Sequence, residues 1–298
     1  MTTDAHLAPK SPEDFPGWQY AYLDIEYHTE TQSVWMCYKI DSPHSYTEGM
    51  LQEIANVRES LRALFGSKYI GQWPIRYFVM ASNKKNIFSF GGDLSEFITA
   101  IRERRLDILI HYGHLAVDVI YGLTAGFDLP IVTVSAVSGQ CLGGGFEGAL
   151  TTDFLIADED AKLGVPEISF NTFPGMGAVS LLARRIGLSL AEQVVSSGKV
   201  YSAAEMQDLG LVNVVATAGA LRETTLDWLR EGGEERWSKR RALIEARRRF
   251  SPLTHEELIR IVELWAECSH SITSQDLRHM ERLAAAQKRI KSLSSEAA

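Results

Sequence analysis

The stretch from Ser138 to Glu167 constrains this chain most, because it places two glutamates behind glycine-containing turns in one short segment. Glu147 follows three consecutive glycines, Gly143 to Gly145, and Glu167 closes the run Gly164-Val-Pro-Glu. Glycine lets a backbone approach a ligand closely, and a helix that begins directly after it leaves unpaired N–H groups facing whatever lies in front. The segment therefore predicts a turn that can hold an oxyanion.

A second glycine turn lies upstream and has the same design. Gly91 and Gly92 stand directly before Asp93-x-x-Glu96, which has the form of a capping box that opens a helix. We therefore expect Asp93 to cap this helix rather than to contact a substrate. Two sets of N–H donors and two carboxyl groups are the parts needed to form and quench a thioester enolate.

Length and composition predict one catalytic domain with a smaller appendage. The chain has 298 residues, of which 45% are hydrophobic and 23% charged, so it can bury a substantial core. A net charge of -8 argues against nucleic acid as a partner. Three cysteines at positions 37, 141 and 268 lack metal-binding spacing and suit a reducing compartment. We find no secretory leader and no apolar run near the roughly 20 residues of a membrane span, so we expect a cytoplasmic protein without membrane insertion.

The order of predicted elements indicates an α/β fold followed by helices. Residues 1–17 are polar and aperiodic, and we expect them to be mobile. Strands and helices alternate from residue 18 to about 215, which is typical of an α/β domain. Residues 216–298 read as wholly helical, with candidate helices at 222–230, 234–250 and 254–291, and would cap the active site or build an oligomer.

Competing interpretations of these motifs are weaker. Gly143-x-Gly145-x-x-Gly148 matches a dinucleotide fingerprint, but the next strand begins too soon for a parallel crossover. His111 and His114 have helical spacing without a third metal ligand, so we treat them as structural. Basic runs at 102–105 and 239–249 would suit an acidic carrier protein or a CoA phosphate, although such runs are more often solvated helix faces. Either glutamate alone would be read as a helix or turn cap; only their joint occurrence with both glycine turns favours catalysis.

The motifs taken together resemble the crotonase (enoyl-CoA hydratase/isomerase) superfamily. The resemblance is carried by Phe90-Gly-Gly-Asp-Leu94, Leu142-Gly-Gly-Gly-Phe-Glu147, Gly164-Val-Pro-Glu167, Pro174-Gly-Met-Gly177, Ser202-Ala-Ala-Glu205 and Gly210-Leu-Val212. Within that superfamily the chain looks most similar to the diffusible signal factor synthases. This narrower likeness is carried by Phe146, the run Phe170 to Ala178, Ile261 to Trp265 and Leu277 to Leu283.

The resemblance implies a fold, a reaction and a set of site residues. It implies a crotonase-type ββα spiral, a homo-oligomer, and no cofactor or metal. The N–H groups of Gly92 and Gly144 would form the oxyanion hole, Glu167 would remove a Cα proton, and Glu147 would protonate the departing hydroxyl group. Met176 and Trp265 would form walls of the acyl pocket.

The implied substrate is a 3-hydroxyacyl thioester of acyl carrier protein or CoA, which would lose water. The signal synthase likeness adds thioester hydrolysis and release of an α,β-unsaturated fatty acid. Two alternatives stay open: an enoyl-CoA hydratase of fatty-acid metabolism, and a non-catalytic binding partner of a sensor kinase.

Overall fold

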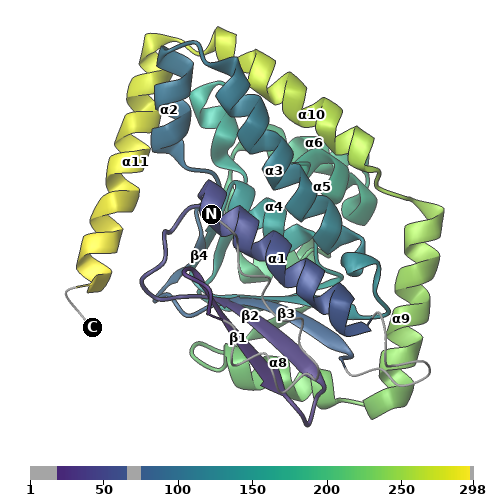
Figure 1. Cartoon of the computed structure of the whole chain (residues 1–298). Helices are drawn as coiled ribbons and strands as arrows, with labels where there is room; N and C mark the ends of the chain where they lie inside the picture. The colour runs from purple at the N-terminus through teal and green to yellow at the C-terminus, as the bar shows by residue number, and fades with distance from the viewer. Residues whose placement is uncertain (1–18, 66–74, 296–298) are drawn as a thin grey trace, which may run out of the picture.

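The computed structural model describes residues 19–65 and 75–295, with side chains as far as residue 289. The predicted mobile segment 1–17 lies outside the described residues. Two sheets form the framework (Figure 1). The larger has six strands in the order β1-β2-β3-β5-β7-β10. Their bounds are Leu23–His28, Ser33–Tyr38, Tyr77–Ser82, Val132–Val137, Phe154–Asp158 and Val214–Ala216.

The larger sheet is parallel except at one edge, where β1 pairs with β2 in antiparallel register. Every residue of β2 and of β5 is buried. Strands buried on both faces are expected where helices cover a parallel sheet on both sides. In Figure 1, α1 (Glu48–Phe65) lies on one side of this sheet and α8 (Leu221–Arg230) on the other.

The smaller sheet positions the site. Its four strands follow the order β4-β6-β8-β9 and span Ile87–Ser89, Gln140–Leu142, Lys162–Gly164 and Val200–Ser202. Strands β4, β6 and β8 are parallel. Because parallel strands end at the same edge of a sheet, the segments that follow these three strands meet there. Those segments are the two glycine turns and the short helix that contains Glu167.

Helix α3 packs between α1 and α10 (His255–Cys268). The helices between the strands are α2 (Leu94–Arg102), α3 (Leu106–Thr124), α4 (Gly144–Leu150), α5 (Ala178–Ile186), α6 (Leu188–Ser197) and α7 (Ala203–Asp208), with 3-10 turns at Gly126–Asp128 and Pro166–Phe170. The contact of α3 with α10 is close, because a Cβ added at Gly113 would lie 2.5 Å from a methyl group of Val262.

Helix α3 corrects one expectation. An 18-residue stretch of this 19-residue helix has a mean hydropathy of 1.2, so by length and composition the helix is long and apolar enough to span a membrane. The sequence expectation that no run approaches that length is therefore wrong. Half of this stretch is buried inside the protein, where α1 and α10 pack against it, and this burial accounts for its apolar character.

The chain ends in α8, α9 (Gly233–Phe250), α10 (His255–Cys268) and α11 (Ser274–Ser295). The helix predicted over 254–291 is divided, because a 3-10 turn at Ser269–Ser271 separates α10 from α11. Thr254 caps α10, and Thr273 hydrogen-bonds Asp276 at the start of α11. Figure 1 shows α10 beside α3 and α11 beside α2. A division of the chain into domains at residue 215 stays a prediction.

Candidate active site

The two glycine turns contact each other at the edge of the smaller sheet. Gly91 has a φ of 81°, and a Cβ added there would lie 2.4 Å from the amide nitrogen of Gly144. No side chain fits into that space, so the close approach of the turns requires glycine. The N–H of Gly143 donates to the carbonyl oxygen of Gly164 at 2.8 Å, which ties the turn before α4 to the end of β8.

The amide groups of Gly92 and Gly144 face the same cavity. Gly144 is the first residue of α4, where helical N–H groups have no acceptor within the helix. Within the described residues, neither N–H donates to a backbone oxygen. A Cβ added at Gly144 would lie 3.4 Å from the nitrogen of Gly92, so the two donors are neighbours. Adjacent, unpaired donors are what an oxyanion hole needs.

Glu147 lies in the first turn of α4 and is 1% exposed. Its Oε1 accepts a hydrogen bond of 2.9 Å from the N–H of Ala178, the first residue of α5. Burial raises the pKa of Glu147 to about 7, although the backbone hydrogen bonds from Ala178 and Met176 favour the ionised form. This carboxyl group therefore titrates near neutrality.

Glu167 lies in the 3-10 turn after β8 and approaches the glycine turn. Its Oε1 lies 2.6 Å from the position that a Cβ of Gly143 would occupy. Its Oε2 is buried and has no hydrogen-bond partner among the described residues. Burial, and after it the negative charge of Glu147, raises the pKa of Glu167 to about 8. An orphaned buried oxygen at a cavity wall is typical of a group that meets a ligand.

The two glutamates hold one proton between them near neutral pH. Because they interact, their protons leave in steps that belong to the pair. Glu147 accepts hydrogen bonds that stabilise a carboxylate, whereas the unpaired oxygen of Glu167 favours the neutral acid. In the free protein, the proton therefore resides mainly on Glu167.

An apolar cavity of about 120 Å³ extends from the two glutamates. The structure places both predicted wall residues in its lining. The sulfur of Met176 lies 3.1 Å from the position of a Cβ on Gly144. Trp265 packs on Gly175, where an added Cβ would lie 2.3 Å from the indole ring, and contacts the ring of Phe97 edge to face at 5.2 Å between centroids.

Other lining residues were not predicted from the sequence to form the pocket. They include Phe97 and Ile101 of α2, Leu109 of α3, and Met280, Leu283 and Gln287 of α11. Positions 280, 283 and 287 recur at helical spacing, and this pattern was the available signal for a face of α11 that covers the cavity. Nothing local to α2 or α11 indicated that they meet.

The remaining candidates take structural positions. Asp93 accepts hydrogen bonds from the N–H groups of Ser95 and Glu96, so it caps α2 as expected. His111 and His114 lie within 3.3 Å of Glu48 and Glu263. The described residues contain no group of three side chains suited to a metal ion.

A protein-family model described as enoyl-CoA hydratase/isomerase matches residues 57–291. The chain belongs to the enoyl-CoA hydratase/isomerase family. Members of this family act on CoA thioesters, and the α/β crotonase fold predicted from the sequence is confirmed. The matched range includes both glycine turns, both glutamates and most of α11.

Solved structures of this enoyl-CoA hydratase/isomerase fold superpose over most of the chain. An enoyl-CoA hydratase/isomerase from Xanthobacter autotrophicus Py2 has a TM-score of 0.69 at 21% identity, covering 94% of this chain and 98% of its own. Human mitochondrial delta3-delta2-enoyl-CoA isomerase has a TM-score of 0.67 at 21% identity, covering 89% and 99%. Pseudomonas aeruginosa DspI has a TM-score of 0.61 at 22% identity, covering 83% and 96%. At these identities the likeness shows the fold alone.

Proposed function

We propose that this family member removes water from a 3-hydroxyacyl thioester, using Glu147 and Glu167 as an acid/base pair. One observation carries the proposal: two carboxyl groups with raised pKa values share a cavity with two unpaired amide donors, at the head of an apolar pocket. Each part has a role in enolate chemistry, and the smaller sheet brings all of them to one edge.

The reaction would proceed through an enolate. The thioester oxygen accepts hydrogen bonds from the N–H groups of Gly92 and Gly144, and ionised Glu167 takes the Cα proton. The electron pair of the broken C–H bond passes to that oxygen, where each donor is worth about 3 kcal/mol in other oxyanion holes. The pair then returns to form the Cα–Cβ double bond, the C–O bond breaks, and Glu147 protonates the departing hydroxyl group. Water and an α,β-unsaturated thioester result.

The location of the proton gives weight to a second function. Dehydration starts with the proton on Glu147 and ends with the proton on Glu167. The hydrogen bonds of the free protein favour the final arrangement, with the proton on Glu167. Hydration of an enoyl thioester starts from that favoured arrangement. Burial raises the pKa of both carboxyl groups, so both are able to carry the shared proton near neutral pH and the pair can work in either direction. An enoyl-CoA hydratase working in the opposite direction is therefore the second candidate.

The proposal includes hydrolysis of the thioester and an acyl carrier protein as substrate, both of which rest on the likeness to the signal synthases. For hydrolysis, a carboxylate takes a proton from water as the oxygen attacks the carbonyl carbon, and the sulfur leaves as a thiol with that proton. A tetrahedral intermediate places its charge on the same oxygen, so the donors of Gly92 and Gly144 serve both steps.

A basic cavity supports an acidic carrier protein. It has a volume of about 650 Å³ and shares Ile101, Leu109, Ser269 and Ile272 with the apolar cavity. Its lining includes Arg102, Arg104, Arg105 and Arg278. Opposite charges steer the approach of a protein partner, and here they lie next to the acyl pocket.

Mass spectrometry of the products tests the proposal. The purified protein is incubated with a medium-chain 3-hydroxyacyl carrier protein and, separately, with the matching CoA ester. We expect free unsaturated acid from the carrier substrate and none from the Glu147→Gln or Glu167→Gln variant. An unsaturated thioester without released acid would reduce the function to a hydratase. Wild-type protein inert toward both substrates, yet able to bind a sensor kinase, would replace the enzymatic proposal by the binding role.

The proposal also includes a cytoplasmic location and a homo-oligomeric state. Cell fractionation tests the first, and light scattering from the purified protein tests the second.

A further inference from the structure

Tyr46 lies between the two glycine turns of the catalytic site, although it belongs to neither of them. It is 5% exposed and stands between β2 and α1 in the sequence. Its N–H donates to the carbonyl oxygen of Gly91 at 2.7 Å, and Tyr46 and Gly92 form an isolated parallel bridge. The main chain of Tyr46 therefore runs along the turn that supplies the Gly92 donor.

The hydroxyl group of Tyr46 reaches the other turn. It lies 3.0 Å from the position that a Cβ of Gly148 would occupy, so the tyrosine packs directly on α4. Gly148 lies about one helical turn after Gly144 in the same helix. Tyr46 thus contacts both segments that carry a proposed oxyanion donor, the Gly92 turn through its backbone and α4 through its side chain.

Two further tyrosines hold Tyr46 in place. The hydroxyl of Tyr112 on α3 donates to the carbonyl oxygen of Tyr46 at 2.7 Å, and the hydroxyls of Tyr38 and Tyr46 hydrogen-bond at 2.9 Å. The Tyr112 oxygen also lies 3.5 Å from the position of a Cβ on Gly92. All three tyrosines are buried. Buried hydrogen bonds of this kind restrict a side chain to one position, because a displaced hydroxyl group would be left unsatisfied.

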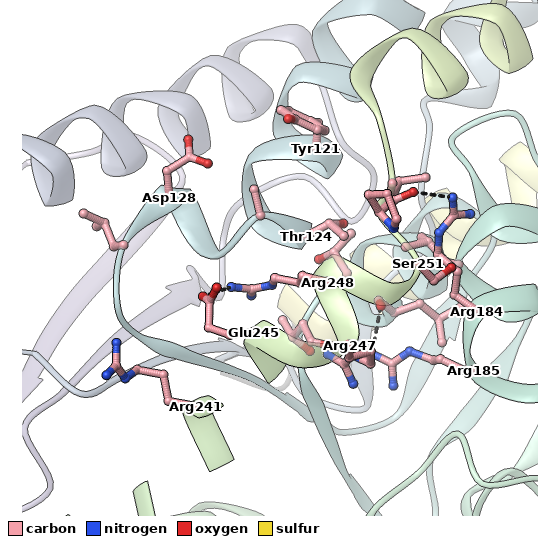
Figure 2. Close-up of a pocket in the computed structure, with 18 of the residues that line it drawn as sticks. Tyr121, Thr124, Asp128, Arg184, Arg185, Arg241, Glu245, Arg247, Arg248 and Ser251 are labelled. Carbon is pink, nitrogen blue, oxygen red and sulfur yellow. Dashed lines mark hydrogen bonds and ion pairs between the residues drawn. The ribbon is translucent and has the colours of Figure 1, made fainter. Parts of the chain in front are cut away.

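Helix α4 is also fixed at the end that lies away from the catalytic cavity. Arg185 (Figure 2) donates to the carbonyl oxygens of Leu150, at 2.9 Å, and of Thr152. Leu150 is the last residue of α4, where helical carbonyls have no donor within the helix. With α4 held in this way, the contact of Tyr46 with both turns is suited to fix the Gly92 turn relative to the helix.

We propose that Tyr46 is a positioning residue that sets the spacing of the oxyanion donors Gly92 and Gly144. The hydroxyl groups of Tyr38 and Tyr112 keep it in place. This inference rests on the proposed function of the two amides. A donor stabilises a developing charge only at hydrogen-bonding distance, so a small displacement reduces catalysis. Because the apolar pocket binds the acyl chain independently, a displacement should lower kcat and leave KM nearly unchanged.

The Tyr46→Phe and Tyr112→Phe variants test this role, because each removes one hydroxyl group from the tyrosine network. With a 3-hydroxyacyl thioester, we expect kcat to fall about tenfold in both variants and KM to stay within about twofold. Tyr77→Phe is the control. Tyr77 is also buried, but its hydroxyl accepts a hydrogen bond from Arg240 of α9 in a different hydrophobic cluster. This variant should lower the Tm without lowering kcat.

A 3-ketoacyl-CoA gives a second readout that does not require turnover. This ester has an acidic proton between two carbonyl groups, and the ultraviolet absorption of its enolate reports how well the protein stabilises a negative oxygen. We expect the wild type to raise the enolate fraction of the bound ester, and both network variants to lose most of that increase. This pattern would support the positioning role even if the wild type left 3-hydroxyacyl thioesters unchanged, a result that would contradict the dehydration proposal alone.

Several results would overturn the positioning role. They are an unchanged kcat and enolate fraction in both folded variants, a rise in KM alone, an equal loss of kcat in Tyr77→Phe, and a wild type that forms no enolate. Thermal unfolding verifies that each variant is folded. If one network variant does not fold, the other decides the result.

Discussion

Replacing either glutamate by glutamine should remove the activity and keep the fold. Glutamine preserves the size of Glu147 and an oxygen that accepts the Ala178 N–H, but it does not transfer protons. We expect turnover to fall at least about 100-fold in each variant, as is usual when a general acid or base is lost. Initial rates measure the effect, and circular dichroism verifies the fold. Exposed Glu192 on α6 offers the matched control, and a loss of similar size in Glu192→Gln would contradict the assignment.

The shared proton predicts a narrow pH optimum. Below about pH 7 both carboxyl groups are protonated and no base is available, whereas above about pH 8 both are ionised and no acid is available. We expect kcat/KM to be bell-shaped between these values. A rate that keeps rising through pH 9 would show that the two groups do not act as a pair.

The same pKa values predict an effect on stability. Both carboxyl groups have pKa values raised above the ordinary 4.5, so the folded state binds more protons than the unfolded state. The free energy of unfolding should therefore fall as the pH rises from about 4.5 through about 8. Glu167→Gln has no charge to bury, so its Tm should exceed that of the wild type at pH 9 but not at pH 4. The same Tm difference between Glu167→Gln and the wild type at pH 4 and at pH 9 would contradict this prediction.

At the scale of elements, the glycine turns and the helix caps could be predicted from the sequence, because the residues that form them are close together in the chain. The turns at Gly91 and Gly143 have positive φ, and Asp93 caps its helix as its spacing predicts. No sequence signal marks the break between α2 and α3, because it lies at Arg104, a non-glycine residue with a φ of 55°. Strands of three residues, such as β4 and β6, are too short to show alternation, yet they assemble the site.

Helix α10 closes the apolar pocket through Trp265, so Trp265→Ala should change chain-length preference. Without the indole ring on Gly175 and Phe97, the pocket deepens and longer acyl chains should gain in relative kcat/KM. The lost contacts should cost about 2–4 kcal/mol, less than for a fully buried tryptophan. A series of acyl lengths and urea unfolding measure these effects. Leu264→Ala alters an exposed neighbour and should change neither the chain-length preference nor the free energy of unfolding. An unaltered chain-length preference in Trp265→Ala would show that Trp265 is not part of the pocket wall.

At the scale of the whole molecule, the sequence motifs were sufficient to predict the family and the fold, because the glycine turns and both glutamates lie in contiguous segments. The face of α11 and the cavity lined by arginines of α5 and α9 were not predictable, since each joins elements far apart in the chain. Arg185 and Arg247, for example, interact only because α9 returns to the end of α5.

A charge reversal on α11 should separate carrier-protein substrates from CoA esters. Arg278 is exposed in the basic cavity beside the acyl pocket. Arg278→Glu should lower kcat/KM for an acyl carrier protein substrate about tenfold at low salt and leave the CoA ester within about twofold, because only the protein partner presents an extended acidic surface. The matching change at exposed Arg249 is the control. Equal losses for both substrates would place Arg278 in general substrate binding.

The packing of α10 on α3 has a consequence for synthesis of the chain. Helix α3 ends at residue 124 and α10 begins at residue 255, 131 positions later. At about 5–20 residues per second, a ribosome needs roughly 7–26 s to make the segment that covers the most apolar helix. During that interval the growing chain presents a surface that attracts chaperones, membranes and other nascent chains. The yield of folded protein should therefore depend on how fast the part of the message that encodes residues 125–268 is translated.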